Sequence, residues 1–487
     1  MALRRRADLL RCFALIGLIL AAAGRLCAAD VPTPATELSP TPLTKTWVPA
    51  ETQAGPIGQW RLGGALRLRY IDLANVTALG LEPYAKHQVA RVRTQVSVAR
   101  RFSPTLRLFG ELANESSKYV DCDSCRGGFD EIIVDNLYLE AVRPHGLPIG
   151  VRLGRQNLFY GDGFLIADGT PLDESRTTYV NGLLITTTIP LWSLDFFAAR
   201  DPHRDEYLPR INNRYTRLSE TDDFLWGIFM ERQPAPGTAL RYTFGPYYVY
   251  KSEKNGDRMA LIHTMGARLG FGVRVVEVAG EVAYQGGKVP AYDFLGPDLE
   301  EVLAGSQSVS ALGGHARLTG HLASLAPLDI EGGYVYLTGD DRKTRNKYEG
   351  WNPLLGRWPM WSELYIYTLA VEALPRPLHQ GIAYWQNLKM PYIRVSYAGN
   401  GPVTFEAKYC WLDAFEDLTI EPTVDPSYEG PTHRGELVEL KLGWNSPRLF
   451  SGHVVYERFM PGDFYNVIEG FVPKDASYFR LEVSRVF

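Results

Sequence analysis

Apolar and polar residues alternate along much of the chain from Trp60 to its end. The alternation is clearest at residues 88–98, where Val92, Val96 and Val98 share one face and arginine, glutamine and serine side chains share the other. Successive side chains of a strand point to opposite faces, so this period of two predicts a β-strand with one apolar and one polar face. The same period recurs in four further segments: residues 65–70, 105–108, 403–409 and 438–444.

Alternation of this kind is common to soluble β-sandwiches and to membrane barrels, which differ in the face that water wets. About 430 residues of strand-rich sequence are too many for one sandwich core. Residues 477–487 alternate up to a C-terminal Phe487, which is typical of outer-membrane barrels. We therefore predict an all-β fold: a transmembrane antiparallel β-barrel of residues 59–487, with about 18 strands, tight turns on one side and long extracellular loops on the other.

Stretches without alternation predict the long connections, at residues 114–130, 201–221, 286–307, 339–385 and 415–433. The longest of them, residues 339–385, contains Trp351, Trp358 and Trp361 and a short helical pattern at residues 364–373. Two alternatives stay open for this segment. It is either an ordered surface loop or a segment that folds over the mouth of the barrel or into its lumen.

The N-terminal residues predict secretion. Three arginines at residues 4–6 precede an apolar run at residues 12–24, which is the pattern of a signal peptide, residues 1–29, cleaved after Ala29. The run is too short to span a membrane, and no later stretch approaches the roughly 18 apolar residues that a membrane helix needs. Residues 30–58 are rich in proline and predict a semi-extended periplasmic segment. The expected location is the outer membrane of a Gram-negative-type bacterium, with membrane lipid around the barrel.

Composition and charge narrow the function. The chain has 46 Gly, 27 Tyr and 21 Phe but only 7 Met, an aromatic-rich usage that argues against a helical bundle. Removing residues 1–29 leaves 46 Lys and Arg against 54 Asp and Glu, a formal charge of −8. This acidic balance argues against bulk binding of nucleic acid. The sequence contains no nucleophile elbow, no zinc-protease helix motif and no phosphate-binding loop, so no enzymatic activity is expected.

The polar face of the first third is rich in arginine. Six arginines have inward parity: Arg67, Arg69, Arg91, Arg93, Arg107 and Arg152. Arg155 joins them only if the strand bulges at Gly154, because strict alternation places it on the apolar face. Guanidinium groups offer carboxylates two parallel charge-assisted hydrogen bonds, so these residues are candidates for an anion-binding pore lining.

An alternative is that lumenal acids, Glu111, Glu140 and Asp195, neutralise these arginines and form a structural ladder. The second half of the chain weakens the anionic interpretation because its inward candidates are of mixed sign. They are Glu277, Glu281, His315, Arg317, Glu331, Glu406, Lys408, Glu439, Lys441, His453 and Glu457. Little selectivity is therefore expected from that part of the wall.

A short motif follows in the same region. Gly154-Arg155-Gln156 precedes a Tyr160-Gly161-Asp162 turn, and Asn181-Gly182-Leu183 begins a later strand. Together with the strand-rich remainder and the terminal aromatic residue, this pattern resembles the alginate-export family of outer-membrane barrels. The resemblance implies a monomeric barrel of about 18 strands whose arginine-lined lumen attracts an anionic uronate polymer. Export of a polymer would also require a periplasmic export machinery as a partner.

Two cysteines lie close together in a predicted external loop. Cys122 and Cys125 have the spacing of a redox or half-zinc motif, but no second pair is present, so a local disulfide is favoured. Cys410 has inward parity and no evident partner, which predicts a buried free thiol.

An acidic loop carries the oxygen ligands that Ca²⁺ prefers, at Asp162, Asp168, Asp173 and Glu174. Their spacing fits no EF-hand. Solvated loop carboxylates are therefore favoured over a Ca²⁺ site, and no cofactor or other metal is expected.

These features together predict a passive outer-membrane channel. Its expected cargo is an anionic saccharide or another small carboxylate that diffuses through a partly arginine-lined pore. An unspecific porin is the alternative within this class. A second class is a plugged barrel that serves as an outer-membrane enzyme or as an anchor for a surface complex. Planar-bilayer conductance separates the classes, because a plugged barrel passes no steady current.

Overall fold

The structure is a computed structural model that describes most of the chain from residue 56 onward. The predicted signal peptide and nearly all of the predicted periplasmic segment, residues 1–55, lie outside the described residues. So do residues 77–78, 81–85, 122–128, 168–178, 206, 210, 212–220, 233–240, 274, 291–292, 295–299, 302–304, 323–326, 342–343, 345, 357–358, 365–384, 400, 418–429, 447–449 and 467–471.

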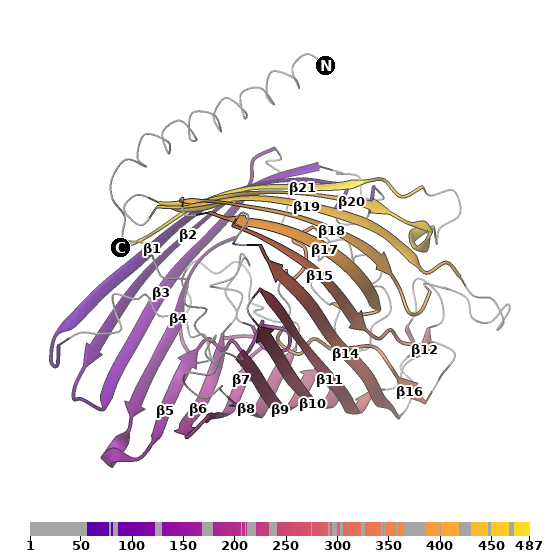
Figure 1. The fold of residues 1–487 in the computed structure, drawn as a ribbon. Coiled ribbons are helices and arrows are strands. Elements are labelled where there is room, and N and C mark those ends of the chain that lie inside the picture. The colour runs from indigo at the N-terminus through magenta and orange to yellow at the C-terminus, as the bar shows by residue number, and fades with distance from the viewer. Residues whose placement is uncertain are drawn as a thin grey trace.

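Eighteen strands of the described residues follow one another around a barrel in the order of the chain (Figure 1). They are β1 (Trp60–Ala74), β2 (Lys86–Arg101), β3 (Leu106–Tyr119), β4 (Phe129–Val142), β5 (Ile149–Gln156), β6 (Val180–Ile189), β7 (Trp192–Asp201), β8 (Asp222–Arg232), β9 (Arg241–Asn255), β10 (Arg258–Val273), β11 (Val276–Pro290), β14 (Ser306–His321), β15 (Leu328–Leu337), β17 (Leu388–Ala398), β18 (Val403–Asp413), β19 (His433–Asn445), β20 (Ser451–Pro461) and β21 (Ala476–Val486). Short elements lie in the connections: β12 (Asp293–Phe294), β13 (Glu300–Glu301), β16 (Lys347–Tyr348) and the 3-10 turns η2 (Pro144–Gly146) and η4 (Asp463–Tyr465).

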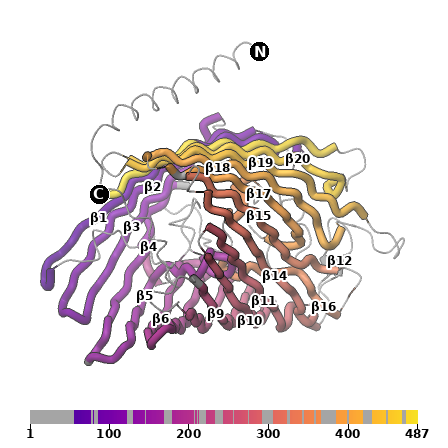
Figure 2. The backbone as a smooth tube through the Cα atoms, viewed as in Figure 1, coloured from indigo at the N-terminus to yellow at the C-terminus, as the bar shows by residue number. Residues whose placement is uncertain are grey.

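Pairing between the first and last strands closes the barrel. Neighbouring barrel strands are antiparallel, and β1 pairs with both β2 and β21. In Figure 2 these two ends of the colour scale run side by side. The Gly64 and Phe487 backbones exchange N–H···O bonds of 2.8 and 2.9 Å. A Cβ on Gly64 would lie 2.5 Å from the Phe487 ring, so glycine leaves room for the terminal aromatic side chain. The closed sheet leaves no unpaired edge in the membrane.

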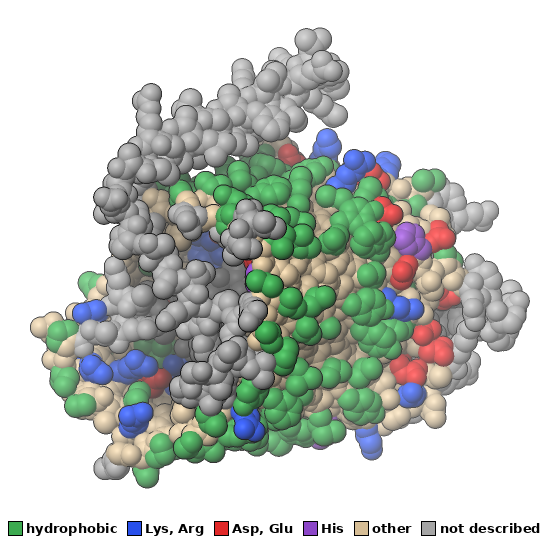
Figure 3. Space-filling model, viewed as in Figure 1, with side chains coloured by type: hydrophobic (Ala, Val, Ile, Leu, Met, Phe, Trp, Pro, Cys, Tyr) green, Lys and Arg blue, Asp and Glu red, His purple; other side chains and the backbone are tan. Residues whose placement is uncertain are grey.

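The wall is apolar outside and polar inside. In β2, Val92 and Val96 are 38% and 53% exposed, whereas Arg93 and Gln95 are 4% and 7% exposed. Figure 3 shows hydrophobic side chains spread over the visible wall and charged side chains gathered at the edge near β12 and β16. This arrangement is the reverse of a soluble sandwich, and it confirms the predicted 18-stranded transmembrane barrel. Within the described part of the chain, no helix is long and apolar enough to cross a membrane.

Two predicted connections are shorter than expected. β3 continues to Tyr119 and β4 begins at Phe129, so residues 114–119 and 129–130 of the predicted connection lie in strands. β11 likewise continues to Pro290. Strand pairing here extends beyond the apolar belt, and both faces are polar: outward Ser116 donates a 2.7 Å hydrogen bond to Asp130. Apolar alternation cannot mark a strand where water wets both of its faces.

Gly154 has a backbone conformation that favours glycine. The register of β5 with β4 and β6 contains no extra residue, so the predicted bulge is absent there, and Arg155, although only 2% exposed, keeps the parity of Leu153 and lies opposite Leu137, which is 40% exposed. Gly154 instead has a φ of +134°, and a Cβ there would lie 2.2 Å from the Leu137 carbonyl oxygen. Only glycine adopts this conformation readily.

We therefore expect Gly154→Ala to destabilise the barrel by about 1–3 kcal/mol, the usual cost of such backbone strain. Denaturant unfolding in detergent, followed by the heat-modifiable mobility of the folded barrel on gels, measures the effect. Gly332→Ala is the matched control, because Gly332 lies in β15 with no atom within 4 Å of the added Cβ. Equal midpoints for the two variants would contradict the assignment.

Candidate functional site in the barrel lumen

Four inward arginines form one patch on the inner wall of β1 and β2. Arg67 lies directly opposite Arg93, and Arg69 lies directly opposite Arg91 in the antiparallel register. We call Arg67, Arg69, Arg91 and Arg93 the arginine patch. Like charges that face each other across strands are destabilising, so the patch requires neighbouring carboxylates.

Carboxylates from β3, β4 and β21 supply that compensation. Arg69 binds Glu482 at 2.6 Å, and Arg93 binds Glu115 at 3.1 Å and Asp135 at 3.2 Å. None of these three acids was predicted from the sequence to line the lumen. Glu115 and Glu482 have inward parity, so the alternation of the sequence could have identified them as lumenal residues. Asp135 lies at a β-bulge opposite Glu111 and Leu112, which turns two successive polar residues of β4 into the lumen.

Arg91 differs from Arg69 and Arg93 because none of the ion pairs named above includes it. Its Nε and Nη1 atoms are buried and have no hydrogen-bond partner among the residues that the structure describes. The cross-strand neighbours of Arg91 are Arg69 and Ser117, neither of which is an acid. The arginine patch thus sets four guanidinium groups against the three named carboxylates. A positive charge without a partner on a wetted wall is a ready site for a solute anion.

The remaining predicted arginines are held in ion pairs. Glu140 accepts hydrogen bonds from both Arg107 and Arg152, the latter at 2.9 Å. Arg155 binds Asp205, from the connection after β7, at 2.7 Å, and its guanidinium lies 3.8 Å from the Tyr179 ring. The pairs of Arg107 and Arg152 with Glu140 are of the kind that the neutral-ladder alternative describes, whereas Arg155 pairs with an acid that this alternative did not include.

The other two predicted lumenal acids, Glu111 and Asp195, are also buried. Glu111, 2% exposed, accepts hydrogen bonds from Gln95 at 3.0 Å and from Asn136 at 3.3 Å. Asp195 is 3% exposed and points inward from β7. Of the three predicted acids, Glu140 forms ion pairs with the predicted Arg107 and Arg152.

Ion pairs of mixed sign line the rest of the wall, as the sequence predicted for the second half. Lys251 on β9 binds Glu253 at 2.6 Å and Asp223 at 3.0 Å. Further pairs join Arg268 to Glu231 (3.1 Å), Arg394 to Glu331 (2.6 Å) and Lys408 to Glu439 (2.5 Å). These charges solvate the lumen and neutralise one another locally.

The connection after β5 folds into the lumen. Residues 157–167, the first inner segment, are almost entirely buried. Tyr160 stacks on Phe229 of β8 with ring centroids 3.9 Å apart, and Asp162 binds Arg317 of β14 at 2.6 Å. Burial raises the pKa of Asp162, but the Arg317 charge and hydrogen bond outweigh it and leave the pKa below its usual value. Asp162 is therefore a structural anion, which removes one carboxylate from the Ca²⁺ candidate.

The long Trp-rich connection also enters the lumen, which decides between the two alternatives left open for it. Residues 351–356 and 359–364 form the second inner segment. Trp351, 1% exposed, stacks on Phe164 of the first inner segment at 5.3 Å. A parallel bridge joins Ile166 to Leu355, and Lys251 donates a 3.0 Å hydrogen bond to the Leu354 carbonyl. The two inner segments therefore pack on each other and on the wall.

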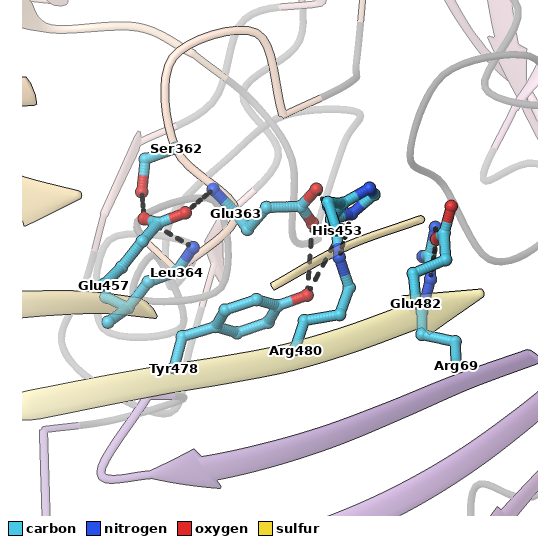
Figure 4. Close-up of polar contacts among 9 residues, drawn as sticks. All are labelled: Arg69, Ser362, Glu363, Leu364, His453, Glu457, Tyr478, Arg480 and Glu482. Atoms are coloured by element: carbon cyan, nitrogen blue, oxygen red, sulfur yellow. Dashed lines mark hydrogen bonds and ion pairs between the residues drawn. The ribbon is translucent and has the colours of Figure 1, made fainter. Parts of the chain in front are cut away.

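Glu457 of β20 fastens the end of the second inner segment (Figure 4). Its carboxylate, 0% exposed, accepts hydrogen bonds from the Ser362 hydroxyl, from the Glu363 N–H at 2.9 Å and from the Leu364 N–H at 3.2 Å. Glu363 in turn binds Arg480 of β21. We call these contacts the clasp. Sequence reasoning named Glu457 as an inward acid but could not assign it a partner in a loop far from it in sequence.

Several predicted features lie outside the described residues. These are Cys122 and Cys125, Asp168, Asp173 and Glu174, Trp358, and all of the expected helix beyond its first residue. Cys410 is a free thiol and is 0% exposed, as predicted. In the part of the chain that the structure covers, no group of three or more His, Cys, Asp or Glu is arranged to hold a metal ion.

A closed barrel with an apolar exterior, a charged lumen and inward-folded connections gives the chain the fold of an outer-membrane β-barrel. Solved structures share this fold. OccAB1 of Acinetobacter baumannii superposes with a TM-score of 0.55 at 10% identity, covering 90% of this chain and 99% of that chain. OccD3 (OpdP) and OccK8 (OprE) of Pseudomonas aeruginosa give TM-scores of 0.52 and 0.51 at 10% and 11% identity, covering 94% and 89% of this chain and 98% and 99% of theirs. No protein-family model and no curated protein matches the sequence.

Proposed function

We propose that the barrel is a channel for anionic solutes that move along the arginine patch. The observation that carries this proposal is Arg91, whose buried Nε and Nη1 atoms have no hydrogen-bond partner among the described residues and which lies beside three further arginines. The contacts of the inner segments named above run to β8, β9, β14, β20 and β21, whereas the patch lies on β1 and β2. The path for solutes therefore runs between the inner segments and the patch.

The cargo that best fits this path is a carboxylate. A planar guanidinium binds a carboxylate through two parallel hydrogen bonds and stays protonated at any relevant pH. The resemblance to the alginate-export family favours a polyuronate, in which carboxylates repeat along a chain. Small organic carboxylates satisfy the same chemistry at a single site, and they remain the alternative cargo. A monomeric state, periplasmic export partners and the absence of enzymatic activity stay predictions.

The test is the reversal potential of single channels across a KCl gradient in planar bilayers. We expect chloride to be preferred over potassium, and uronate oligomers to reduce the chloride current because they occupy the patch. A conducting channel without anion preference would identify an unspecific porin, an outcome consistent with the many neutral ion pairs. The inner segments favour a second candidate, the plugged barrel, and the absence of any steady current would identify it.

A further inference from the structure

Two cross-strand pairs of tryptophan and arginine lie on the outer surface of the barrel. Trp60 begins β1 and pairs in register with Arg100 near the end of β2. Trp192 begins β7 and pairs in register with Arg232 at the end of β8. The Arg100 guanidinium carbon lies 4.8 Å from the Trp60 ring centroid, and that of Arg232 lies 5.8 Å from the Trp192 ring. The same tryptophan–arginine pair thus occurs twice, once on β1 and β2 and again six strands later on β7 and β8.

Each arginine has a second aromatic neighbour. The Arg100 guanidinium lies 5.4 Å from the Phe102 ring, and that of Arg232 lies 5.9 Å from the Tyr242 ring. Among the described residues, neither Nε atom has a hydrogen-bond partner, although both are buried, and no carboxylate forms an ion pair with either arginine. The aromatic rings cover the flat faces of the guanidinium and leave N–H groups at its edge for an anion.

Both pairs face the membrane at the same rim. Arg100 shares the outward parity of Val92 and Val96, and Arg232 shares that of Phe224 and Ile228, which are 45% and 37% exposed. β1 begins at the rim where β21 ends. Because neighbouring strands are antiparallel, β7 begins at this rim, and β2 and β8 end there, so both pairs lie at the same rim. The connections there are short, which is the periplasmic side of such barrels. The adjoining leaflet consists of phospholipids, whose headgroups carry a phosphate.

We propose that Trp60–Arg100 and Trp192–Arg232 are two binding sites for the headgroup phosphate of periplasmic-leaflet phospholipids. The apolar stem and stacked ring of each pair contact the acyl boundary, and the guanidinium edge binds the phosphate. Arg458 at the opposite rim also faces outward. It differs from Arg100 and Arg232 because its charge is paired with Asp475 at 2.5 Å. This inference does not depend on what the lumen transports.

Native mass spectrometry of the mature full-length barrel tests the proposal. The protein in a non-ionic detergent is titrated with phosphatidylglycerol and, separately, with a diacylglycerol of the same acyl chains, which lacks the phosphate. We expect two retained phosphatidylglycerol molecules and weak retention of diacylglycerol. Arg100→Gln and Arg232→Gln should each weaken one site about fivefold, the usual effect of one basic residue at a charged membrane surface.

The control is Arg458→Gln, which should bind phosphatidylglycerol as the wild type does. The double variant Arg100→Lys/Arg232→Lys keeps both charges and loses the planar stack, and it should bind with intermediate affinity. Equal phosphatidylglycerol retention by the wild type and by Arg100→Gln/Arg232→Gln would overturn the proposal. Equal retention of diacylglycerol by the wild type, or displacement of the lipid by an equal concentration of inorganic phosphate, would overturn it as well.

Discussion

Replacement of Arg91 by glutamine is expected to abolish most of the anion preference of the channel. A unit charge about 5 Å from the ion path contributes about 0.8 kcal/mol in a water-like dielectric, roughly a fourfold change in local anion concentration. In the part of the chain that the structure describes, the Arg91 Nε and Nη1 atoms have no hydrogen-bond partner, so we expect its charge to act on solutes. The reversal potential of Arg91→Gln across a KCl gradient measures the loss.

The double variant Arg91→Gln/Arg93→Gln should go further and prefer cations. Loss of Arg93 leaves Glu115 and Asp135 without the guanidinium that both of them bind, so the local charge becomes negative. Arg458→Gln removes an arginine from the outer surface and is the control, for which we expect the wild-type reversal potential. An unchanged anion preference in Arg91→Gln would mean that solutes do not pass along β1 and β2.

The sequence could predict the wall of the barrel because its signal is local. In β2 the type of each residue indicates its face: Val92 and Val96 are exposed on the outer wall, and Arg93 is buried. The ends of the strands carry no such signal, since β3 extends to Tyr119 through residues that are polar on both faces. The apolar alternation indicates the part of a strand whose outer face is apolar, and it ends where both faces become polar.

The candidate site could be predicted only in part for a related reason. Parity placed the arginines of β1 and β2 inside, but the partner of each depends on register between strands that are distant in sequence. Arg69 binds Glu482, which lies 413 residues away and becomes a neighbour only when the barrel closes. Asp135 enters the lumen through a bulge, and Asp205 reaches Arg155 from a connection. Two adjacent polar residues in an otherwise alternating strand were the one local sign of that bulge.

Tertiary packing also decides the position of the Trp-rich connection. Its tryptophans suit a surface loop and a lumenal segment equally well, until Phe164 and the inward carboxylate of Glu457 are seen to meet it. A buried carboxylate that accepts two backbone N–H groups and a hydroxyl compensates for its own desolvation through charge-assisted hydrogen bonds. The clasp therefore has a structural effect that can be measured by removing it.

Glu457→Ala is expected to give the second large effect, a higher and noisier single-channel conductance. The alanine leaves the Glu363 and Leu364 N–H groups without their acceptor, and each lost charge-assisted hydrogen bond costs about 1.5–3 kcal/mol. The end of the second inner segment should then detach from β20 and widen the path. Limited proteolysis from the extracellular side should cut the variant near residues 359–364 faster than the wild type.

A graded series separates this release from a general loss of barrel stability. Ser362→Ala removes one donor and keeps both backbone contacts, so its conductance should stay near that of the wild type. Glu457→Gln keeps one acceptor oxygen and should be intermediate. In a double-mutant cycle, Arg480→Ala should add little to Glu457→Ala, because Arg480 holds the same segment through Glu363. Wild-type conductance in Glu457→Ala would show that the clasp does not set the width of the pore.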